Sequence, residues 1–226
     1  MNRVCIRLVL ASLALFRVQG AEFRNLNFEQ ANLPVIPRGQ FGDYIPISQG
    51  LPGWSVFVGT AQVTQVLHNN FSLGGSIPSI LGPISPASVI IERNYTALLV
   101  AGSPADLSLT QTGLIPTGVQ SIIFEAISGN GPFTVSLGGN LIPIIPLETT
   151  PGYTLYGGDI AAFAGQTTEL RFTSVSIFSQ GGGLNTLYLD SIQFSTTSVP
   201  EPSTLGLFAL GGLLLGFTRW RCKCKS

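Results

Sequence analysis

Between residues 21 and 199, apolar and polar side chains alternate with a period of two, which is the spacing of a β-strand that buries one face. The segments 107–110 and 133–137 show this alternation throughout, and no apolar period of 3.6 residues competes with it. Many short strands separated by glycine- and proline-rich turns are typical of antiparallel sandwiches and barrels. We therefore predict an all-β fold, an antiparallel β-sandwich, for this part of the chain.

Turn residues predict how several of these strands connect. The β-branched and aromatic run 119–127 leads into 133–137 through Ser-Gly-Asn-Gly-Pro at 128–132, which is a hairpin signal. Leu-Gly-Gly-Asn-Leu at 137–141 is a second candidate turn. We therefore expect two successive hairpins in this region.

Three further segments limit where strands can lie. In 169–178 the apolar positions change parity, which predicts a β-bulge near Thr173 or Ser174. Two prolines restrict 141–147 to an edge strand or an extended loop, because proline cannot donate a ladder hydrogen bond. The stretch 69–86, rich in Gly, Pro and Ser, is predicted to be a loop.

The charges are sorted along the chain, although their formal sum is zero. Residues 21–199 contain four arginines, no lysine and ten carboxylates, which leaves a net charge of −6. A nucleic-acid-binding protein needs clustered cations to neutralise phosphates, so this class of function is excluded. The three cysteines, Cys5, Cys222 and Cys224, lie outside this region, so neither a disulfide nor a catalytic thiol is expected within it.

The first twenty residues have the layout of a secretory signal peptide. Two arginines precede the nine-residue apolar run 8–16, and Val18 and Gly20 occupy the −3 and −1 positions of a cut after Gly20. The apolar run is too short to span a bilayer, and a buried N-terminal helix is the alternative. We assign 1–20 to a helical signal peptide and 21–197 to an exported ectodomain.

The final segment, 198–226, has three parts. Pro200, Glu201 and Pro202 come first, and the charge-free stretch 203–218 follows, about 24 Å long as a helix. We predict a transmembrane helix over about 203–218, with the ectodomain outside the cytoplasm. The tail 219–226 should stay in the cytoplasm because of its basic side chains, which are Arg219, Arg221, Lys223 and Lys225.

This tripartite order resembles the PEP-CTERM sorting signal. The resemblance implies that an exosortase, a membrane-embedded cysteine protease, recognises Pro200, Glu201 and Pro202. It also implies that the helix and the basic tail are then removed, and that the ectodomain is released or attached to the surface. We therefore expect the protein in the inner membrane before processing and at the cell surface or in the extracellular matrix afterwards. Cys222 and Cys224 depart from the arginine run that is usual in such tails.

Four short motifs of the ectodomain resemble galactose-binding-like jelly rolls, which also serve as carbohydrate-binding modules of glycosidases. The motifs are Asn-Phe-Glu at 27–29, Pro-Gly-Trp-Ser-Val at 52–56, and the segments 163–172 and 188–194. Their order and spacing carry the resemblance, which covers most of 23–195. It implies that the sandwich is a jelly roll.

The same resemblance implies one cofactor, a structural Ca²⁺ held by Glu29 and Asp190. Strand parity supports half of this assignment, because Asp190 shares its side with Ile192 and should point inward. An inward carboxylate needs a partner, which could be a cation or an arginine, notably Arg24 or Arg171. A solvated carboxylate in a turn is a further alternative.

Four aromatic residues are candidates for contact with a glycan: Trp54, Tyr44, Tyr153 and Tyr156. An aromatic face packs against the apolar side of a pyranose, so a neutral sugar can be held without charge. Trp54 follows Pro-Gly at the start of an expected strand, where a tryptophan in the core is the competing interpretation.

No concentrated catalytic constellation is present in the sequence. His68 is the sole histidine, and its neighbours Asn69 and Asn70 suit neither metal binding nor acid–base chemistry. No Gly-x-Ser-x-Gly nucleophile elbow accompanies it, and no spacing singles out a glycosidase pair among the carboxylates. We therefore predict no catalytic residues and no enzymatic activity.

These observations predict an exported, exosortase-sorted protein of the cell surface or extracellular matrix, with a structural or adhesive role and weak glycan binding. Its expected partners are the exosortase-type protease, the membrane through the C-terminal helix before processing, and extracellular polysaccharide, but no nucleic acid. The alternative is a hydrolase or lyase that acts on extracellular polysaccharide.

Overall fold

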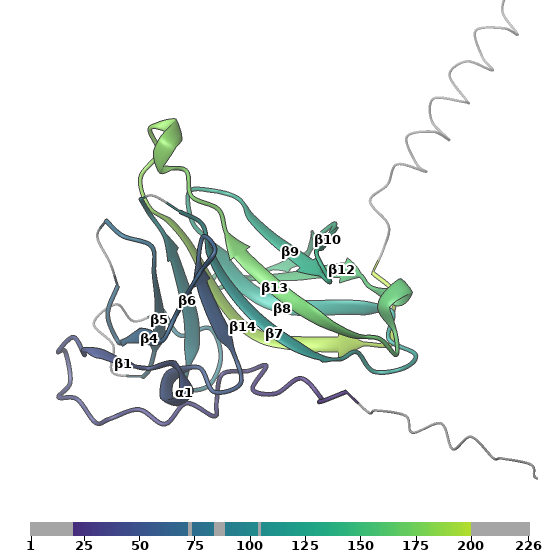
Figure 1. The fold of residues 1–226 in the computed structure, drawn as a ribbon, viewed down its shortest axis with the longest axis horizontal. Coiled ribbons are helices and arrows are strands. Elements are labelled where there is room, and N and C mark those ends of the chain that lie inside the picture. Colours follow the sequence, from purple (N-terminus) through teal and green to yellow (C-terminus); the bar gives the residue numbers. More distant parts are fainter. Residues whose placement is uncertain (1–19, 72–73, 84–88, 104, 200–226) are drawn as a thin grey trace, which may run out of the picture.

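The computed structural model describes residues 20–71, 74–83, 89–103 and 105–199, and these form two facing β-sheets (Figure 1). The predicted transmembrane helix, and all of the predicted signal peptide except Gly20, lie outside these ranges. Within the ranges, no helix is long and apolar enough to cross a membrane. The helical elements described are α1 (Ile47–Gly50) and two 3₁₀ turns, η1 (Ala161–Phe163) and η2 (Phe178–Gln180).

The described strands divide into a larger and a smaller sheet. The larger sheet has eight strands, in the spatial order β1 (Tyr44–Pro46), β4 (Gln65–His68), β5 (Ile77–Leu81), β6 (Thr96–Ala101), β14 (Asn185–Ser195), β8 (Ser121–Ser128), β12 (Thr154–Asp159) and β11 (Ile145–Thr149). The smaller sheet has six, in the order β10 (Asn140–Ile142), β9 (Phe133–Leu137), β13 (Thr167–Ser174), β7 (Leu107–Leu114), β2 (Ser55–Val58) and β3 (Ala61–Val63). All pairings are antiparallel except that of β4 with β5. The predicted all-β, sandwich-like class is confirmed, while the jelly-roll assignment stays a prediction.

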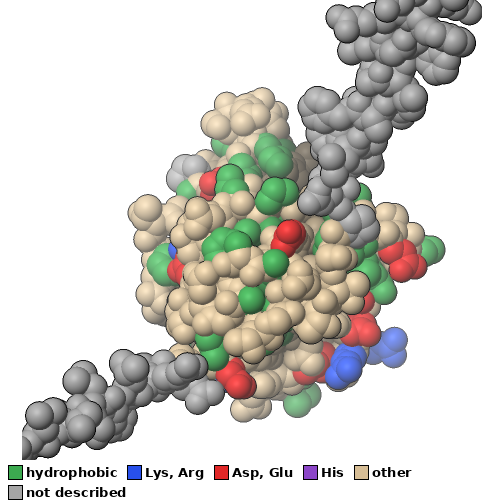
Figure 2. Space-filling view, turned by 90° about the vertical axis from the view of Figure 1, so that its right-hand side faces the viewer, with side chains coloured by type: hydrophobic (Ala, Val, Ile, Leu, Met, Phe, Trp, Pro, Cys, Tyr) green, Lys and Arg blue, Asp and Glu red, His purple; other side chains and the backbone are tan. Residues whose placement is uncertain are grey.

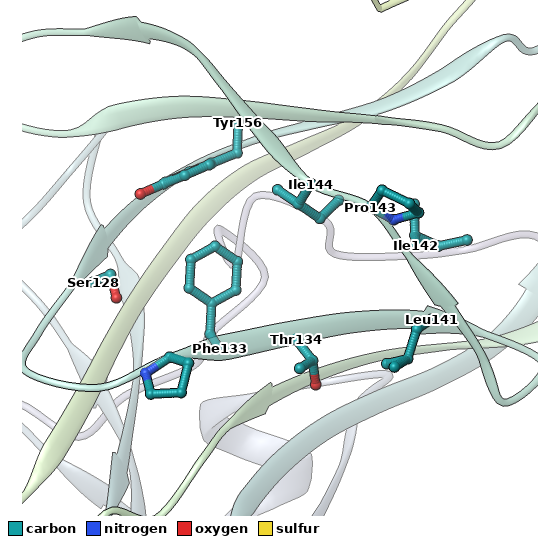
Figure 3. Close-up of a pocket in the computed structure, with 9 residues that line it drawn as sticks. Ser128, Phe133, Thr134, Leu141, Ile142, Pro143, Ile144 and Tyr156 are labelled. Atoms are coloured by element: carbon teal, nitrogen blue, oxygen red, sulfur yellow. The ribbon is translucent and has the colours of Figure 1, made fainter. Parts of the chain in front are cut away.

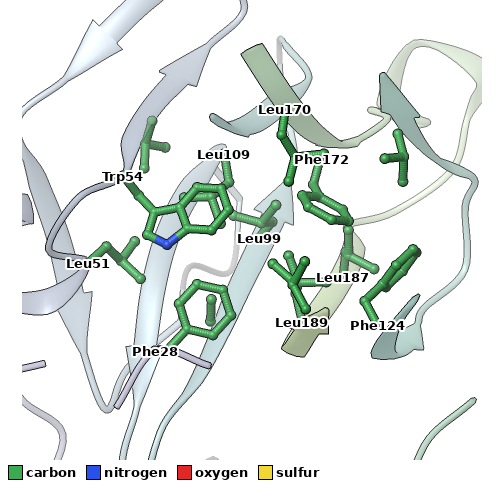
Figure 4. Close-up of a cluster of buried hydrophobic side chains, with 14 of the residues drawn as sticks. Phe28, Leu51, Trp54, Leu99, Leu109, Phe124, Leu170, Phe172, Leu187 and Leu189 are labelled. Carbon is green, nitrogen blue, oxygen red and sulfur yellow. The ribbon is translucent and has the colours of Figure 1, made fainter. Parts of the chain in front are cut away.

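One hydrophobic core joins the two sheets. Alternate residues of each strand enter it, as Leu109 does on β7 and Phe172 on β13, and both are fully buried. Phe124 of the larger sheet meets Phe172 of the smaller sheet edge to face, with ring centroids 5.1 Å apart (Figure 4). Burial of each such side chain contributes about 1.5–3 kcal/mol, so this layer of contacts holds the sandwich together.

One predicted hairpin is confirmed. β9 and β10 are antiparallel neighbours, and Leu137 pairs with Asn140 across a two-residue turn. The turn residues Gly138 and Gly139 have φ values of 55° and 81°. Two successive residues with positive φ form the tight turn whose twist matches a hairpin, and glycine adopts this conformation without a steric penalty.

The other predicted hairpin is wrong. β8 and β9 do not pair but lie in opposite sheets, because the segment 128–132 carries the chain from one layer to the other. Asn185 holds this crossing: its side-chain oxygen accepts a hydrogen bond from the Gly131 N–H at 2.9 Å, and its amide donates to the Pro132 carbonyl at 2.9 Å. The same turn-forming residues therefore serve a connection between sheets.

The bulge predicted near Thr173 or Ser174 is also wrong. The ladder between β13 and β7 has no register shift along the whole of the described strand, and β13 ends at Ser174. The change of parity beyond it arises because the chain leaves the sheet. A bulge lies instead in β14, directly after Asp190, where Ser191 has a φ of 48°.

Of the predictions for the two proline-containing segments, one is confirmed and the other is wrong in part. β10 and β11 are edge strands of their sheets, which confirms the prediction for 141–147. The stretch 69–86 contains β5, however, so the loop prediction for it is wrong in part. β5 is paired with β4 only at Ser79 and Ile80, so Pro78 lies beyond the parallel ladder, and its missing N–H removes no bond there.

Candidate functional site

Trp54 packs in the core and is not a surface platform. Its side chain is 4% exposed, its indole N–H donates to the Asn25 carbonyl at 3.0 Å, and its ring lies 5.8 Å from that of Phe28 (Figure 4). The interpretation of Trp54 as a glycan contact is therefore wrong, and the competing core interpretation is confirmed.

The three tyrosine candidates lie in different places. Tyr44 is 52% exposed on the edge strand β1. Tyr153 is half-buried beside Glu125, whose charge raises the pKa of the Tyr153 phenol. Tyr156, on β12, lines a pocket and is the candidate that the structure brings together with other potential ligand-binding groups.

This pocket, which we call the β9–β12 pocket, has a volume of about 480 Å³. It opens where β9 and β10 of the smaller sheet lie beside β12 of the larger sheet, next to residues 143 and 144, which connect β10 to β11 (Figure 3). Its lining consists of Ser128, Pro132, Phe133, Thr134, Leu141, Ile142, Pro143, Ile144 and Tyr156.

Two aromatic rings form a rigid corner of the β9–β12 pocket. The rings of Phe133 and Tyr156 lie 5.2 Å apart at 81°, and Phe124 stacks against Tyr156 at 5.6 Å and 20°. In Figure 3 this corner lies on one side of the pocket and Leu141 on the other. Because Phe124 belongs to the core, the orientation of the Tyr156 ring is determined by the fold.

The polar groups of the β9–β12 pocket are uncharged. The side chains of Ser128, Thr134 and Tyr156 supply hydroxyls, and no Asp, Glu, Lys, Arg or His lines it. Apolar walls with a few hydroxyls suit a neutral ligand that has an apolar face.

Asp190 points away from the core, contrary to the prediction from strand parity. Leu189 enters the core, so its neighbour Asp190 lies on the outer face of the larger sheet, with Tyr188. The bulge at Ser191 resets the alternation and returns Ile192 to the core. The parity argument fails because an extra residue in a strand exchanges its two faces.

Asp190 is nevertheless 1% exposed, because the segment that leads into β6 covers it. Its Oδ2 accepts hydrogen bonds from the Thr96 hydroxyl at 2.9 Å and from the Glu92 N–H at 3.3 Å. Its Oδ1 accepts one from the Ser191 N–H at 2.7 Å. The Asp190 carboxylate thus links β14 to the segment that leads into β6.

Glu29 fastens the same entry segment. Its oxygens accept hydrogen bonds from the Asn94 N–H at 3.0 Å, the Asn94 side-chain amide at 2.9 Å and the Tyr95 N–H at 3.1 Å. Phe28, with a φ of 58°, is fully buried in the core, which places the adjacent Glu29 against this segment.

The described residues do not fit the calcium site implied for Glu29 and Asp190. Calcium takes six to eight oxygen ligands, and the part of the chain described contains no group of three or more His, Cys, Asp or Glu side chains placed to hold a metal. The hydrogen-bond partners of both carboxylates are N–H and O–H donors. Both carboxylates are therefore occupied by hydrogen bonds to the segment that leads into β6 or to β14 itself.

The arginine alternative is not found either. The salt bridge present among the described residues joins Arg171 to Glu169, at 3.0 Å, and not to Asp190. Arg171 also lies over the Phe57 ring, with its guanidinium carbon 5.3 Å from the ring centroid.

Two more carboxylates lie close to Asp190, and neither was among the site residues predicted from the sequence. Glu125 is the cross-strand partner of Asp190 on β8, and Glu92 accepts a hydrogen bond from the Ser191 hydroxyl at 2.7 Å. Burial raises the pKa of Asp190 to about 7, in opposition to its hydrogen bonds, and the charge of Glu125 adds to the rise. Burial and then the charge of Glu92 raise the pKa of Glu125. Burial and the charge of Glu125 therefore favour proton uptake by Asp190 near neutral pH.

His68 lies at the end of β4 and is 3% exposed. Burial lowers its pKa, and its Nδ1 has no hydrogen-bond partner. A neutral, buried imidazole whose Nδ1 accepts no hydrogen bond has the character of a core side chain.

Comparison with known families concerns the C-terminal segment. Residues 198–221 match the model described as the PEP-CTERM protein-sorting motif. The motif implies export and sorting by an exosortase. The match includes Pro200, Glu201 and Pro202 and ends at Arg221, so it covers part of the basic tail. No curated protein matches the chain.

Processing by an exosortase, a membrane protease, follows from this motif, as does release at the surface. The sorting residues themselves and the basic side chains Arg219, Arg221, Lys223 and Lys225 lie outside the described residues. The last described residues, Ser198 and Val199, are the first two of the matched segment.

Proposed function

We propose that the processed protein is a non-catalytic component of the cell surface or extracellular matrix that binds neutral glycans weakly through the β9–β12 pocket. Its role is structural or adhesive. The observation that supports this proposal is the rigid corner of Phe133 and Tyr156 in an open pocket with hydroxyls and no charged side chain. The sorting motif supports the proposed location, because it implies export and sorting by an exosortase.

The surface of the sandwich favours a neutral partner over an acidic one. The net charge of −6 between residues 21 and 199 repels polyanions at long range. Figure 2 shows a face on which acidic groups are scattered, few basic groups are visible, and neither charged nor apolar side chains cover most of the surface. This face offers mostly uncharged polar groups to a hydrated polysaccharide and few cationic groups to an anionic one.

Replacement of Leu141 by aspartate should weaken glycan binding at least about tenfold, or about 1.4 kcal/mol. Leu141 is 70% exposed at the pocket, so the new carboxylate would face an apolar ligand surface without disturbing the core. Val35→Asp is the matched control, because Val35 is 97% exposed and does not line the pocket. A glycan array followed by calorimetric titration of the strongest neutral ligand measures the effect.

The proposal fails if Leu141→Asp binds as tightly as the wild type, or if Val35→Asp weakens binding equally. Release of reducing ends from exopolysaccharide by the wild-type protein would contradict the non-catalytic role. That result would favour the hydrolase or lyase alternative instead.

A further inference from the structure

The chain stays in contact with the larger sheet beyond the end of β14. Ser195 still pairs with Ser121 of β8. The Ser121 hydroxyl, which is fully buried, then donates a hydrogen bond to the Thr197 carbonyl at 2.7 Å, and the Thr197 N–H donates to the Ser195 hydroxyl at 3.0 Å. Residues 195–197 are therefore bound to Ser121, the first residue of β8.

Val199 continues this contact onto β12. A Cβ atom on Gly157 would lie 2.9 Å from Val199 Cγ2 and 2.7 Å from Leu147 Cδ1, so both side chains pack directly against the glycine backbone. Tyr156 enters the core region, so its neighbour Gly157 faces the outer side of the larger sheet. The segment 197–199, which we call the docked segment, thus crosses the outer face from β8 to β12.

The docked segment overlaps the beginning of the sorting motif. The matched segment starts at Ser198, and Pro200, Glu201 and Pro202 directly follow Val199. A protease that binds an extended substrate around this motif needs the residues on its N-terminal side as well. Those residues are held by β8 and β12, and no free linker separates the sandwich from the motif.

We propose that docking of residues 197–199 on the larger sheet restrains proteolytic processing, so that a protease engages the motif only after this segment is released. The rate of processing then follows the fraction of molecules in which the segment is open, as it does when local opening is fast relative to cleavage. This proposal rests on the sorting motif and is independent of glycan binding.

Two variants release the docked segment without changing the matched motif. Ser121→Ala removes the hydrogen bond to the Thr197 carbonyl, and a net loss of about 1 kcal/mol corresponds to about a fivefold larger open fraction. Gly157→Ala places a methyl group against Val199 Cγ2 and the end of Leu147, both of which can move away. We expect a similar effect from each.

Matched controls remove the same kinds of group elsewhere. Ser108→Ala deletes a buried hydroxyl of the smaller sheet, which is hydrogen-bonded to Thr173 at 2.9 Å. Gly152→Ala adds a methyl group whose nearest neighbour, Thr150 Oγ1, is 4.0 Å away. Ser108 is hydrogen-bonded within the smaller sheet, and a Cβ atom on Gly152 would meet Thr150 and not the docked segment.

The test measures hydrogen exchange of the full chain in detergent and compares the Thr197 N–H, which lies in the docked segment, with the Ile115 N–H, which donates to the Gln166 carbonyl at 2.9 Å far from it. In Ser121→Ala and Gly157→Ala, the ratio of the exchange rate at Thr197 to the rate at Ile115 should rise about fivefold, and in both controls it should equal the wild-type ratio. Pulse-chase labelling in cells that contain an exosortase should show the same order of precursor loss. An unchanged or lower ratio in either variant would overturn the proposal, because global unfolding alone accelerates both sites.

Discussion

Replacement of Asp190 by asparagine is expected to raise the free energy of unfolding at pH 8. The wild-type protein should become more stable when the pH is lowered from 8 towards 4.5, and the variant should lose most of this pH dependence. The pKa of Asp190 is raised from an ordinary 3.8 to about 7 by burial. Between pH 4 and pH 7 the folded state therefore binds more protons than the unfolded state, and the free energy of unfolding falls as the pH rises. At pH 8 the ionised, buried carboxylate lowers stability by up to about 4 kcal/mol.

Asparagine suits the same position because it is neutral at every pH. Its carbonyl can accept the hydrogen bond from the Ser191 N–H, and its amide can donate to the Thr96 hydroxyl. Urea unfolding at pH 8, 6 and 4.5 measures the effect, with Asp43→Asn as the control because Asp43 is exposed. Burial lowers the pKa of His68, which reduces stability in acid, but this contribution is common to all variants and cancels in the difference.

A loss of stability in Asp190→Asn at pH 8 would contradict this account. It would mean that the ionised carboxylate is stabilised by a bound cation, as the resemblance to calcium-binding jelly rolls implies. In that case a chelator would lower the melting temperature of the wild type and leave that of Asp190→Asn unchanged.

Replacement of Trp54 by alanine should lower the free energy of unfolding by about 3–5 kcal/mol. The indole is nearly fully buried and contacts Phe28, and its loss also removes one of the two hydrogen bonds that the Asn25 carbonyl accepts. Tyr44→Ala, at an aromatic residue that is 52% exposed, should change stability by less than about 0.5 kcal/mol.

Chemical denaturation of both variants at pH 6 measures this difference. Under native conditions, any folded Trp54→Ala protein should bind glycans as the wild type does. A stable Trp54→Ala variant with lost glycan binding would show instead that Trp54 is a sugar platform.

The fold class could be predicted from the sequence because strand periodicity is a local property. The alternation in 107–110 and 133–137 corresponds to β7 and β9, and the turn at 137–141 needs only two adjacent glycines. The crossing at 128–132 could not be predicted, since a turn between neighbouring strands and a crossing between sheets use the same residues. Its direction depends on the distant Asn185.

The candidate site was predictable only in part, for a similar reason. Tyr156 was identified as an aromatic candidate, but its partner Phe133 and the rim residue Leu141 come from other strands, and only the fold brings them together. Glu125 did leave a signal, because it is a carboxylate within the apolar run 119–127. The inward orientation predicted for Asp190 failed at the Ser191 bulge, which no local pattern marks.

The most direct test of the central claim is the intact mass and location of the mature protein. The account predicts that cells with an active exosortase yield an extracellular or surface-bound β-sandwich that lacks both the N-terminal signal segment and the C-terminal helix with its basic tail. Mass spectrometry of the protein recovered from outside the cells would show this directly. A cytosolic protein with the full mass of 23.9 kDa, trimmed at neither end, would contradict it.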